Sequence, residues 1–299
     1  MSYCCAGIVL FNPELERLRE NINSIENQVD KIILIDNCST NVEDVIAEYG
    51  GKENFTIIRN NINKGIATAL NQICDQALKW EYEWVLLLDQ DSICSHTMVD
   101  SYKEYIHDDT NALITPYIVD INKMNFEEYL ELDLPTITEV DWAITSGSLI
   151  KISVWKKIGK FFEDLFIDAV DIDYSMRLKI NNYRQVRVNT EYLLQEVGFA
   201  EPTWIFRPHK DNAKKWSIKR YYRTNHSLLR QYYMTRNNII LARKYSNYNS
   251  LIKRIGFSLL MAFPKPLVEK SKVKLCRTLV KGFYDGFKFN VTKYKRGEL

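Results

Sequence analysis

Apolar and polar positions follow two patterns along the first ninety residues. Short apolar runs occur at residues 3–10, 31–36, 55–59 and 84–89. Such runs, bounded by polar turn residues, are typical of strands that are buried on both faces. Between the runs, apolar residues recur every three or four positions, which is the spacing of a helix with one buried face. The pattern predicts a series of βαβ units and a mostly parallel sheet flanked by helices.

Two acidic residues directly follow the fourth apolar run. Asp89 and Asp91 stand in the sequence Asp-Gln-Asp-Ser, where that run ends. In a mostly parallel sheet, ligands bind outside the carboxyl ends of the strands. Mg²⁺ and Mn²⁺ take oxygen ligands from one or two carboxylates and complete their coordination with water and substrate phosphates. Asp89 and Asp91 therefore indicate a divalent metal site, although a solvated turn or a helix cap uses the same residues.

Two other kinds of acidic loop contain a similar sequence. An EF-hand needs Gly at the sixth position of its loop, where this chain has Cys94, which argues against that site. A haloacid dehalogenase-type phosphatase also has Asp-x-Asp after an apolar strand and would use Asp89 as its nucleophile. In that class the motif stands near the start of the fold, whereas three strand–helix units precede it here. The phosphatase stays open as an alternative.

A second acidic group comes at the start of a predicted helix. Asp168, Asp171 and Asp173 alternate there with apolar residues. The helix dipole stabilises a carboxylate in the first turn, which suits an acid that stays ionised and accepts a proton. Capping of the helix is the alternative function of these aspartates. Asp36 and residues 60–65 also follow predicted strands, so we expect them at the same edge of the sheet as Asp89.

Composition limits the class of protein. With 299 residues, of which 46% are hydrophobic and 26% charged, the chain can bury a large core and is neither disordered nor fibrous. Its six cysteines contain no Cys-x-x-Cys pair, and its four histidines are scattered. No zinc site or histidine relay is expected, and free thiols fit a reducing cytoplasm. We therefore expect catalysis to depend on carboxylates.

Charge divides the chain unequally. Residues 1–209 contain 18 Lys and Arg against 34 Asp and Glu, whereas residues 210–299 contain 22 against 4. We expect an α/β domain over residues 1–209, followed by a basic, mainly helical region (210–299). That region presents either a solvated basic face or a surface for an anionic membrane. No nucleic-acid-binding motif accompanies the charge, so no nucleic acid partner is expected.

Membrane-spanning and secretion signals are not expected. No stretch approaches the roughly 20 apolar residues of a transmembrane helix, and the first apolar run is too short for a signal peptide. The expected location is the cytoplasm, at the inner face of the cell membrane.

Several short segments, in this order, resemble the inverting family 2 glycosyltransferases, and most closely the bacterial rhamnosyltransferase-like group that extends surface polysaccharides. The resemblance covers roughly residues 3 to 240. The matching segments are Phe11-Asn12-Pro13, Ile35-Asp36-Asn37-Cys38-Ser39, residues 60–67 with Asn71, residues 88–92, Ser146-Gly147-Ser148, residues 166–173 through Arg177 and residues 232–237.

This resemblance implies a GT-A fold, a nucleotide-diphosphate-sugar donor and Mg²⁺ or Mn²⁺. It also implies that the α/β domain has a nucleotide-sugar-binding half (1–111) and an acceptor-binding, catalytic half (112–209). By that similarity Asp36 contacts the nucleotide base and Asp89 lies near the ribose. Asp91 reaches the metal that bridges the diphosphate, and Asp171 is the catalytic base. Attack opposite the leaving group inverts the anomeric centre.

Further residues are assigned to binding by the same resemblance. Each group also has a structural alternative. Residues 63–65 can form a helix-entry turn, the two arginines can pair with acidic helices, and the Ser-Gly-Ser segment can pack within a strand. The expected donor-binding residues also include Asn63, Lys64, Gly65, Gln90, Arg177 and Arg236, and the expected acceptor-binding residues are Ser146, Gly147, Ser148 and Asp168.

One position departs from the related group. Those proteins usually have His three residues before a Gly that follows the catalytic helix, and Gln195 stands there, before Gly198. Metal affinity or donor orientation is therefore in question, and a donor-binding protein without transfer activity stays open. The expected donor is dTDP-rhamnose, with a UDP-hexose or UDP-galactofuranose as alternatives, and the expected acceptor is a glycan or lipid-linked saccharide. The sequence assigns neither linkage nor oligomeric state.

Overall fold

The computed structural model describes residues 4–122, 124–196, 201–210, 216–223, 226–248, 250–262, 265–268 and 271–292. The chain forms two compact units. The first contains Met1–Phe166 and Val170–Val197, and the second contains Ile167–Ala169 and Gly198–Glu298. The two predicted halves, 1–111 and 112–209, thus share the first unit up to residue 197. The division falls near residue 197 instead of at the expected 209/210.

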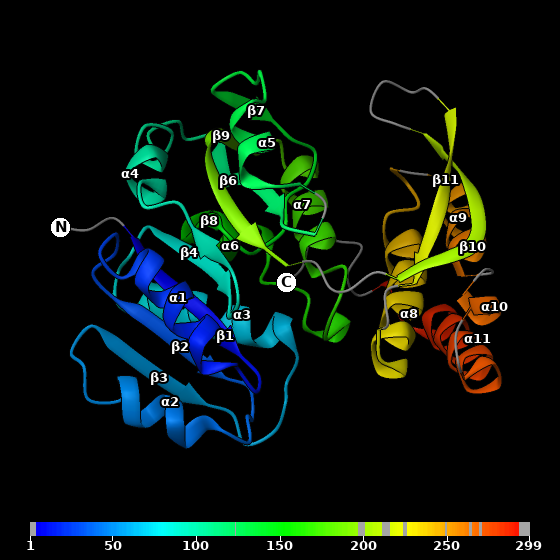
Figure 1. Cartoon of the computed structure of the whole chain (residues 1–299), viewed down its shortest axis with the longest axis horizontal. Helices are drawn as coiled ribbons and strands as arrows, with labels where there is room; N and C mark the ends of the chain where they lie inside the picture. Colours follow the sequence, from blue (N-terminus) through cyan, green and yellow to red (C-terminus); the bar gives the residue numbers. More distant parts are fainter. Residues whose placement is uncertain are drawn as a thin grey trace. The chain divides into compact units, whose positions relative to one another are not determined.

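Four parallel strands form one side of the central sheet of the first unit, in the order β3-β2-β1-β4 (Figure 1). The residues of β1, β2 and β4 are almost all buried, as continuous apolar runs require, whereas β3 at the edge of the sheet buries only Phe55 fully. These strands confirm the predicted βαβ series. Their bounds are β1 Cys4–Leu10, β2 Ile32–Asp36, β3 Phe55–Arg59 and β4 Trp84–Asp89.

Three helices connect these strands: α1 (Leu15–Ile25), α2 (Val42–Tyr49) and α3 (Ile66–Lys79). Each buries the apolar stripe that its spacing predicts. At Gly7 in β1, an added Cβ would lie 2.1 Å from Ile73 of α3, so this glycine lets the helix approach the strand closely.

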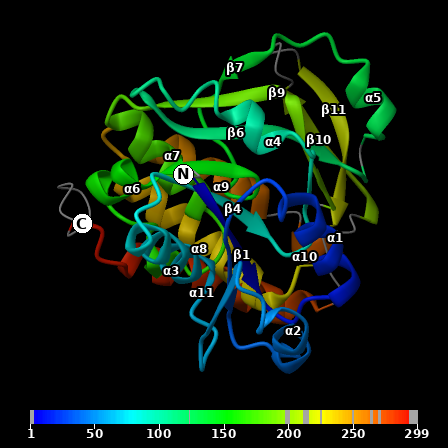
Figure 2. The same ribbon diagram turned by 90° about the vertical axis from the view of Figure 1, so that its left-hand side faces the viewer.

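The sheet continues beyond β4 in the order β8-β6-β9-β5, and β7 also pairs with β9. β8 is antiparallel to both β4 and β6, whereas β6 and β9 are parallel and run beside each other (Figure 2). The predicted mostly parallel sheet flanked by helices is confirmed. The strands are β5 Ile93–Cys94, β6 Asn111–Asp120, β7 Ile137–Glu139, β8 Ser148–Lys151 and β9 Arg184–Gln195; the helices are α4 Met98–Tyr102, α5 Phe126–Leu130, α6 Ile152–Ile158, the 3₁₀ helix η1 Glu163–Leu165 and α7 Val170–Ile180.

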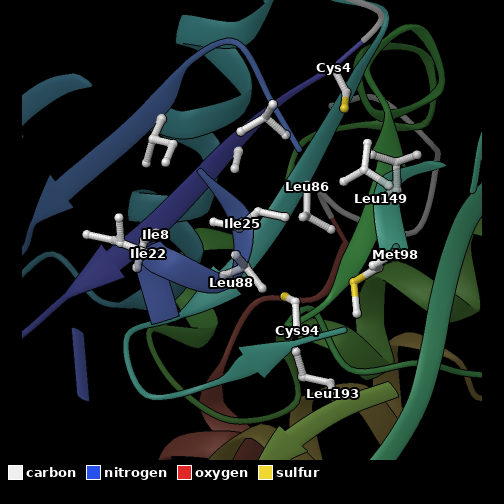
Figure 3. Packing of buried hydrophobic residues seen from close by; sticks show 14 of the residues in the cluster. Cys4, Ile8, Ile22, Ile25, Leu86, Leu88, Cys94, Met98, Leu149 and Leu193 are labelled. Carbon is white, nitrogen blue, oxygen red and sulfur yellow. The ribbon is translucent and has the colours of Figure 1, made fainter. Parts of the chain in front are cut away.

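The core of the first unit joins the sheet to α1 and α4 (Figure 3). Ile8 and Leu88 from neighbouring strands pack with Ile22 and Ile25 of α1, and Met98 of α4 belongs to the same cluster. Burying these large apolar side chains contributes roughly 1.5–3 kcal/mol each before entropy is subtracted. The core therefore fixes the strand ends at which the polar residues stand.

The second unit contains an antiparallel hairpin and four described helices. The sequence does not predict this hairpin. Its two strands pair with each other and lie outside the central sheet. None of the described helices is long and apolar enough to cross a membrane. The elements are β10 Glu201–Lys210, β11 Trp216–Arg223, α8 Leu228–Lys244, α9 Leu251–Ala262, α10 Lys265–Val268 and α11 Lys272–Lys288.

Candidate functional site

The carboxyl ends of the parallel strands bring the predicted polar residues to one edge of the first unit. Asp36 is the last residue of β2 and pairs with Leu10, and Asp89 is the last residue of β4 and pairs with Val9. The strand register thus confirms that both aspartates stand at the same edge. Asp36 is 2% exposed, and one of its carboxylate oxygens accepts a hydrogen bond from the Ser39 amide at 3.0 Å.

Asn37 organises the loop after β3. Its amide donates to Asn63 Oδ1 at 3.0 Å, and its own Oδ1 accepts the backbone N–H of Lys64 at 2.9 Å. Asn63 Oδ1 also accepts the N–H of Gly65 at 2.9 Å. The side chain of Lys64 is exposed. The loop is therefore fixed through its backbone, and its lysine extends into solvent, where it can meet a phosphate.

Hydrogen bonds from four residues hold the Asp-Gln-Asp segment in place. The Asp89 N–H donates to Ser146 Oγ at 2.9 Å, and an Asp89 carboxylate oxygen accepts from Gln195 Nε2 at 3.2 Å. Gln90 exchanges two hydrogen bonds with the backbone of Phe11, at 2.8 and 3.3 Å. The buried Asn21 donates to the carbonyl oxygens of Asp89 and Ser92. These contacts fix the turn before any ligand binds.

Asp91 lines a small pocket of about 170 Å³ in the first unit, together with Arg17, Gln195 and Glu196. Burial raises the pKa of Asp91 above its ordinary value, and the Glu196 charge adds to this rise. The backbone N–H of Asp91 and the Arg17 guanidinium act in the opposite direction, and Arg17 forms an ion pair with Glu196 at 2.6 Å. The pocket therefore concentrates negative charge that a cation would stabilise.

The chemistry of this pocket fits Mg²⁺ or Mn²⁺. Asp91, Gln195 and Glu196 supply oxygen atoms to its lining, and such cations prefer oxygen to nitrogen or sulfur. Asp89 lies beside the pocket, since its carboxylate accepts a hydrogen bond from Gln195. Among the described residues, no group of three or more His, Cys, Asp or Glu side chains is close enough to hold a metal ion unaided. Donor phosphates are the ligands that normally complete such a site.

Asp171 lies in the first turn of α7. Its carboxylate is half-buried and accepts the N–H of Ile172 at 2.8 Å. Just before this helix, Phe166, Asp168 and Ala169 have φ angles of 63°, 63° and 66°. Non-glycine residues rarely adopt this left-handed region, and such strain is concentrated at functional sites.

A model of the glycosyl transferase family 2 matches residues 5–175, which include Asp36, Asp89, Asp91 and Asp171. The chain belongs to glycosyl transferase family 2. This match covers more than half of the chain and supports a transferase in place of the phosphatase alternative. The chain is also 25% identical over 308 residues to the dTDP-rhamnosyl transferase RfbF of Shigella flexneri, covering 95% of this chain and 98% of that protein.

Solved structures have the same fold as this family 2 transferase. S. aureus TarS (residues 1–349) matches with a TM-score of 0.58 and 13% identity, covering 95% of this chain and 81% of that chain. The TarS complex with UDP-GlcNAc matches at 0.53 and 14%, covering 96% and 92%. GalNAc-T7 with UDP, GalNAc and Mn²⁺ matches at 0.50 and 14%, covering 64% of this chain and 43% of that chain. These similarities confirm the predicted GT-A fold.

The Ser-Gly-Ser segment of the transferase is buried and holds the end of β4 through hydrogen bonds. Ser146 and Ser148 are 1% and 0% exposed. Ser146 holds the Asp89 amide, and Gly147 donates to the Leu87 carbonyl at 2.8 Å while its own carbonyl accepts from Tyr102 Oη. This burial favours the strand-packing alternative, and acceptor contact by these residues stays a prediction.

Arg177 lies on the buried side of α7. Its Nε donates to Asp173 at 2.9 Å, and its Nη1 donates to the carbonyl oxygens of Ile158 and Gly159. With Arg177 7% and Asp173 0% exposed, the pair favours the structural alternative for this arginine. Donor binding by Arg177 stays a prediction.

Asp168 and Arg236 belong to the second unit of the transferase. Asp168 accepts three hydrogen bonds from Arg230, two from Nε at 3.2 and 3.3 Å and one from Nη2 at 3.1 Å. The Arg236 guanidinium lies 4.7 Å from the centre of the Tyr233 ring. The roles predicted for Asp168 and Arg236 remain predictions.

Several residues that shape the site were not singled out in the sequence. Asn37 stands directly after Asp36, and its position at a strand end was the signal that could have identified it. Arg17 and Glu196 are 179 positions apart in the sequence, and no local pattern connects them. Val197 and Gly198, which complete the segment after Gln195, lie outside the described residues.

Proposed function

We propose that this protein transfers a sugar, with inversion, from a nucleotide-diphosphate donor onto a glycan or lipid-linked glycan in bacterial surface polysaccharide biosynthesis. Rhamnose from dTDP-rhamnose is the favoured donor. The similarity to a dTDP-rhamnosyl transferase over nearly the whole of both chains carries this choice. The shared strand-end position of Asp36 and Asp89, followed by Asp91, supports donor binding at this edge.

Asp171 is the proposed general base. Its place in the first helical turn suits a negatively charged carboxylate, because the helix dipole and the Ile172 N–H stabilise negative charge. An ionised carboxylate can take the proton from the acceptor hydroxyl as that oxygen attacks the anomeric carbon. The bond to the departing nucleotide diphosphate breaks on the opposite face of the sugar.

Asp91 and Asp89 are the proposed protein ligands of Mg²⁺ or Mn²⁺. When bound, the cation supplies positive charge beside the departing diphosphate. Gln195 holds the Asp89 carboxylate, while Ser146 and Asn21 hold the Asp89 backbone through the hydrogen bonds described above. Lys64 extends from the neighbouring loop and is suited to contact the same phosphates.

A thermal-stabilisation screen tests this function. The protein is heated with dTDP-rhamnose, UDP-galactofuranose or a UDP-hexose, each with and without Mn²⁺. Bound ligand raises the unfolding temperature by mass action, so dTDP-rhamnose with Mn²⁺ should give the largest rise. The absence of both stabilisation and donor hydrolysis across the panel would refute the proposal. Stabilisation by a UDP-sugar alone would change the donor.

The Asp171→Asn variant separates catalysis from binding. We expect transfer and donor hydrolysis to fall about a hundredfold or more, because asparagine cannot accept the proton. Donor affinity, measured by calorimetry, should stay within about twofold. Loss of donor binding would contradict the role of base, whereas normal donor binding without transfer in the unaltered protein would favour the non-catalytic alternative.

We also infer that the second unit holds the enzyme at an anionic membrane surface. On α11, Val273, Val280, Tyr284 and Phe287 are exposed and recur at spacings of seven, four and three, which places them on one face. A basic stripe lies beside them, formed by Lys274, Arg277, Lys281 and Lys288. An exposed apolar stripe beside a basic one is typical of helices that lie in the membrane interface.

A further inference from the structure

The second unit contains a pocket that the proposed donor chemistry does not use. It has a volume of about 420 Å³ and lies between the start of the hairpin and the segment of α10 and α11. Pockets of this size commonly bind small molecules. Its lining includes Glu201, Trp204, Arg223, Leu267, Val268 and Lys272.

Arg223 has hydrogen-bonding capacity left over in this pocket. One of its terminal nitrogens forms an ion pair with Glu201, and the other donates to the Val268 carbonyl at 3.2 Å. Its Nε–H is buried and finds no acceptor among the described residues. A buried donor without a partner lowers stability, so an oxygen atom from a ligand or a water is expected to meet it.

Trp204 supplies a large apolar surface at the same place. It is 71% exposed, although tryptophan is usually well buried, and Leu267 beside the pocket is 46% exposed. The flat face of an indole packs well against another apolar face, and the C–H face of a sugar ring is such a surface. Sugar hydroxyls at the ring edge then need polar partners, which Glu201 and Arg223 provide.

The charges favour a neutral ligand. Glu201 offsets the charge of Arg223, so Lys272 contributes the remaining positive charge of the lining. A diphosphate would place several negative charges beside the Glu201 carboxylate, which is unfavourable. A polyhydroxylated ring meets both the donors and the acceptor without that cost.

We propose that this pocket binds a saccharide unit of the acceptor glycan, apart from the sugar that is transferred. The assignment to the acceptor rests on the proposed function, whereas saccharide binding itself does not require transfer. The pocket would hold a growing chain by a residue already incorporated and so favour polymer over free monosaccharide as acceptor.

Binding without a donor tests this proposal. The protein, residues 1–299, is applied to an array of lipid-free oligosaccharides from bacterial surface polysaccharides. Some of these oligosaccharides contain rhamnose and others do not. We expect Trp204→Ala to weaken the best binding about tenfold or more, and Trp204→Phe to keep most of it, since an aromatic face remains. Trp142→Ala is the matched control, because Trp142 is an exposed tryptophan of the first unit (58%) and should leave binding unchanged.

Two further measurements make the test decisive. Glu201→Gln should also weaken saccharide binding, since it removes the negative charge of the acceptor for sugar hydroxyls. The variant should fold, because the Glu201 side chain is 55% exposed. Stabilisation by the donor sugar nucleotide should be the same in every variant, so loss of the donor site is distinguished from loss of this pocket. Equal saccharide binding by Trp204→Ala and the unaltered protein would overturn the proposal. So would the absence of saccharide binding together with Arg223-dependent binding of inorganic diphosphate.

Discussion

Gly65 is the residue that lets the loop after β3 approach the segment before α7. Its φ is 83°, and a Cβ added to it would lie 2.5 Å from the carbonyl oxygen of Phe166. The neighbouring Ile66 N–H donates to that same oxygen at 2.7 Å. Glycine is thus required here both for its conformation and for the space that it leaves.

Gly65→Ala should destabilise the first unit and weaken donor binding. We expect the free energy of unfolding to fall by about 1–3 kcal/mol, because alanine is strained at this φ and collides with Phe166. Chemical denaturation and donor calorimetry measure the two effects. Gly51→Ala is the control, since its added Cβ meets no described atom within 4 Å and should change neither value. Equal effects of the two substitutions would contradict the assigned contact.

Gln195→His tests the departure from the related group. Gln195 donates to Asp89 and lines the Asp91 pocket. Mn²⁺ prefers oxygen ligands but also accepts a neutral imidazole, which would add a ligand beside the carboxylate oxygens, so we expect Mn²⁺ to bind roughly tenfold more tightly in this variant. Electron paramagnetic resonance titration of free Mn²⁺ measures this without any turnover. Unchanged or weaker Mn²⁺ binding would show that position 195 does not support the metal.

Helices α8 and α11 pack closely because α11 has glycines at the contact. A Cβ added to Gly286 would lie 2.8 Å from both the Arg236 carbonyl oxygen and Ile239 Cβ, and one added to Gly282 would lie 2.9 Å from the Tyr232 carbonyl oxygen. Tyr232 Oη also donates to Asp285 of α11 at 2.6 Å. Small residues let the two backbones come together, as in other close helix pairs.

Gly286→Leu should separate these helices. We expect a loss of about 1–3 kcal/mol in the free energy of unfolding, since the added side chain has no space. Thermal unfolding followed by circular dichroism measures it. Gly256→Ala in α9 is the control: its Cβ meets no described atom within 4 Å, and alanine should stabilise the helix by up to about 1 kcal/mol. A neutral Gly286→Leu would show that the contact is looser than described.

The elements with clear periodicity could be predicted from the sequence, and those that depend on distant partners could not. The strands up to Asp89 and their helices follow from local patterns, which also place Asp36, Asp89 and Asp91 at strand ends. The interleaved basic and aromatic residues at 216–223 predict a helix, whereas the structure has a strand there whose partner, β10, lies in a region without a clear period. The support of Asp89 by Ser146 spans 57 positions, a distance over which no sequence pattern applies.

At the scale of the whole molecule, charge is distributed very unevenly along the chain. The excess of acidic residues before residue 209 and of basic residues after it gives the last third a net charge that anionic lipids attract. In the proposed attachment, the exposed apolar stripe of α11 would add a second contribution that does not depend on salt. Electrostatic attraction alone would be screened at high ionic strength.

Vesicle sedimentation tests this attachment. We expect the protein to bind vesicles containing anionic lipid, to bind neutral vesicles weakly, and to lose much of the binding as salt increases. Val280→Asp combined with Phe287→Asp should reduce binding about tenfold, because both side chains are exposed on the proposed face. Leu130→Asp is the control, as Leu130 is 65% exposed on α5 of the first unit. Equal binding by the two altered proteins would exclude α11 as the attachment surface.

The short segment Ile167–Ala169 has a consequence for how this protein can be divided. These three residues pack within the second unit, where the buried Asn237 donates to the carbonyl oxygens of Ile167 and Asp168 at 2.7 and 3.0 Å. Two residues later the chain reaches Asp171. A protein shortened after residue 197 would therefore keep every strand of the central sheet but lose the amide that anchors the approach to its proposed base. Exchanging the basic region between relatives would therefore require exchanging residues 167–169 with it.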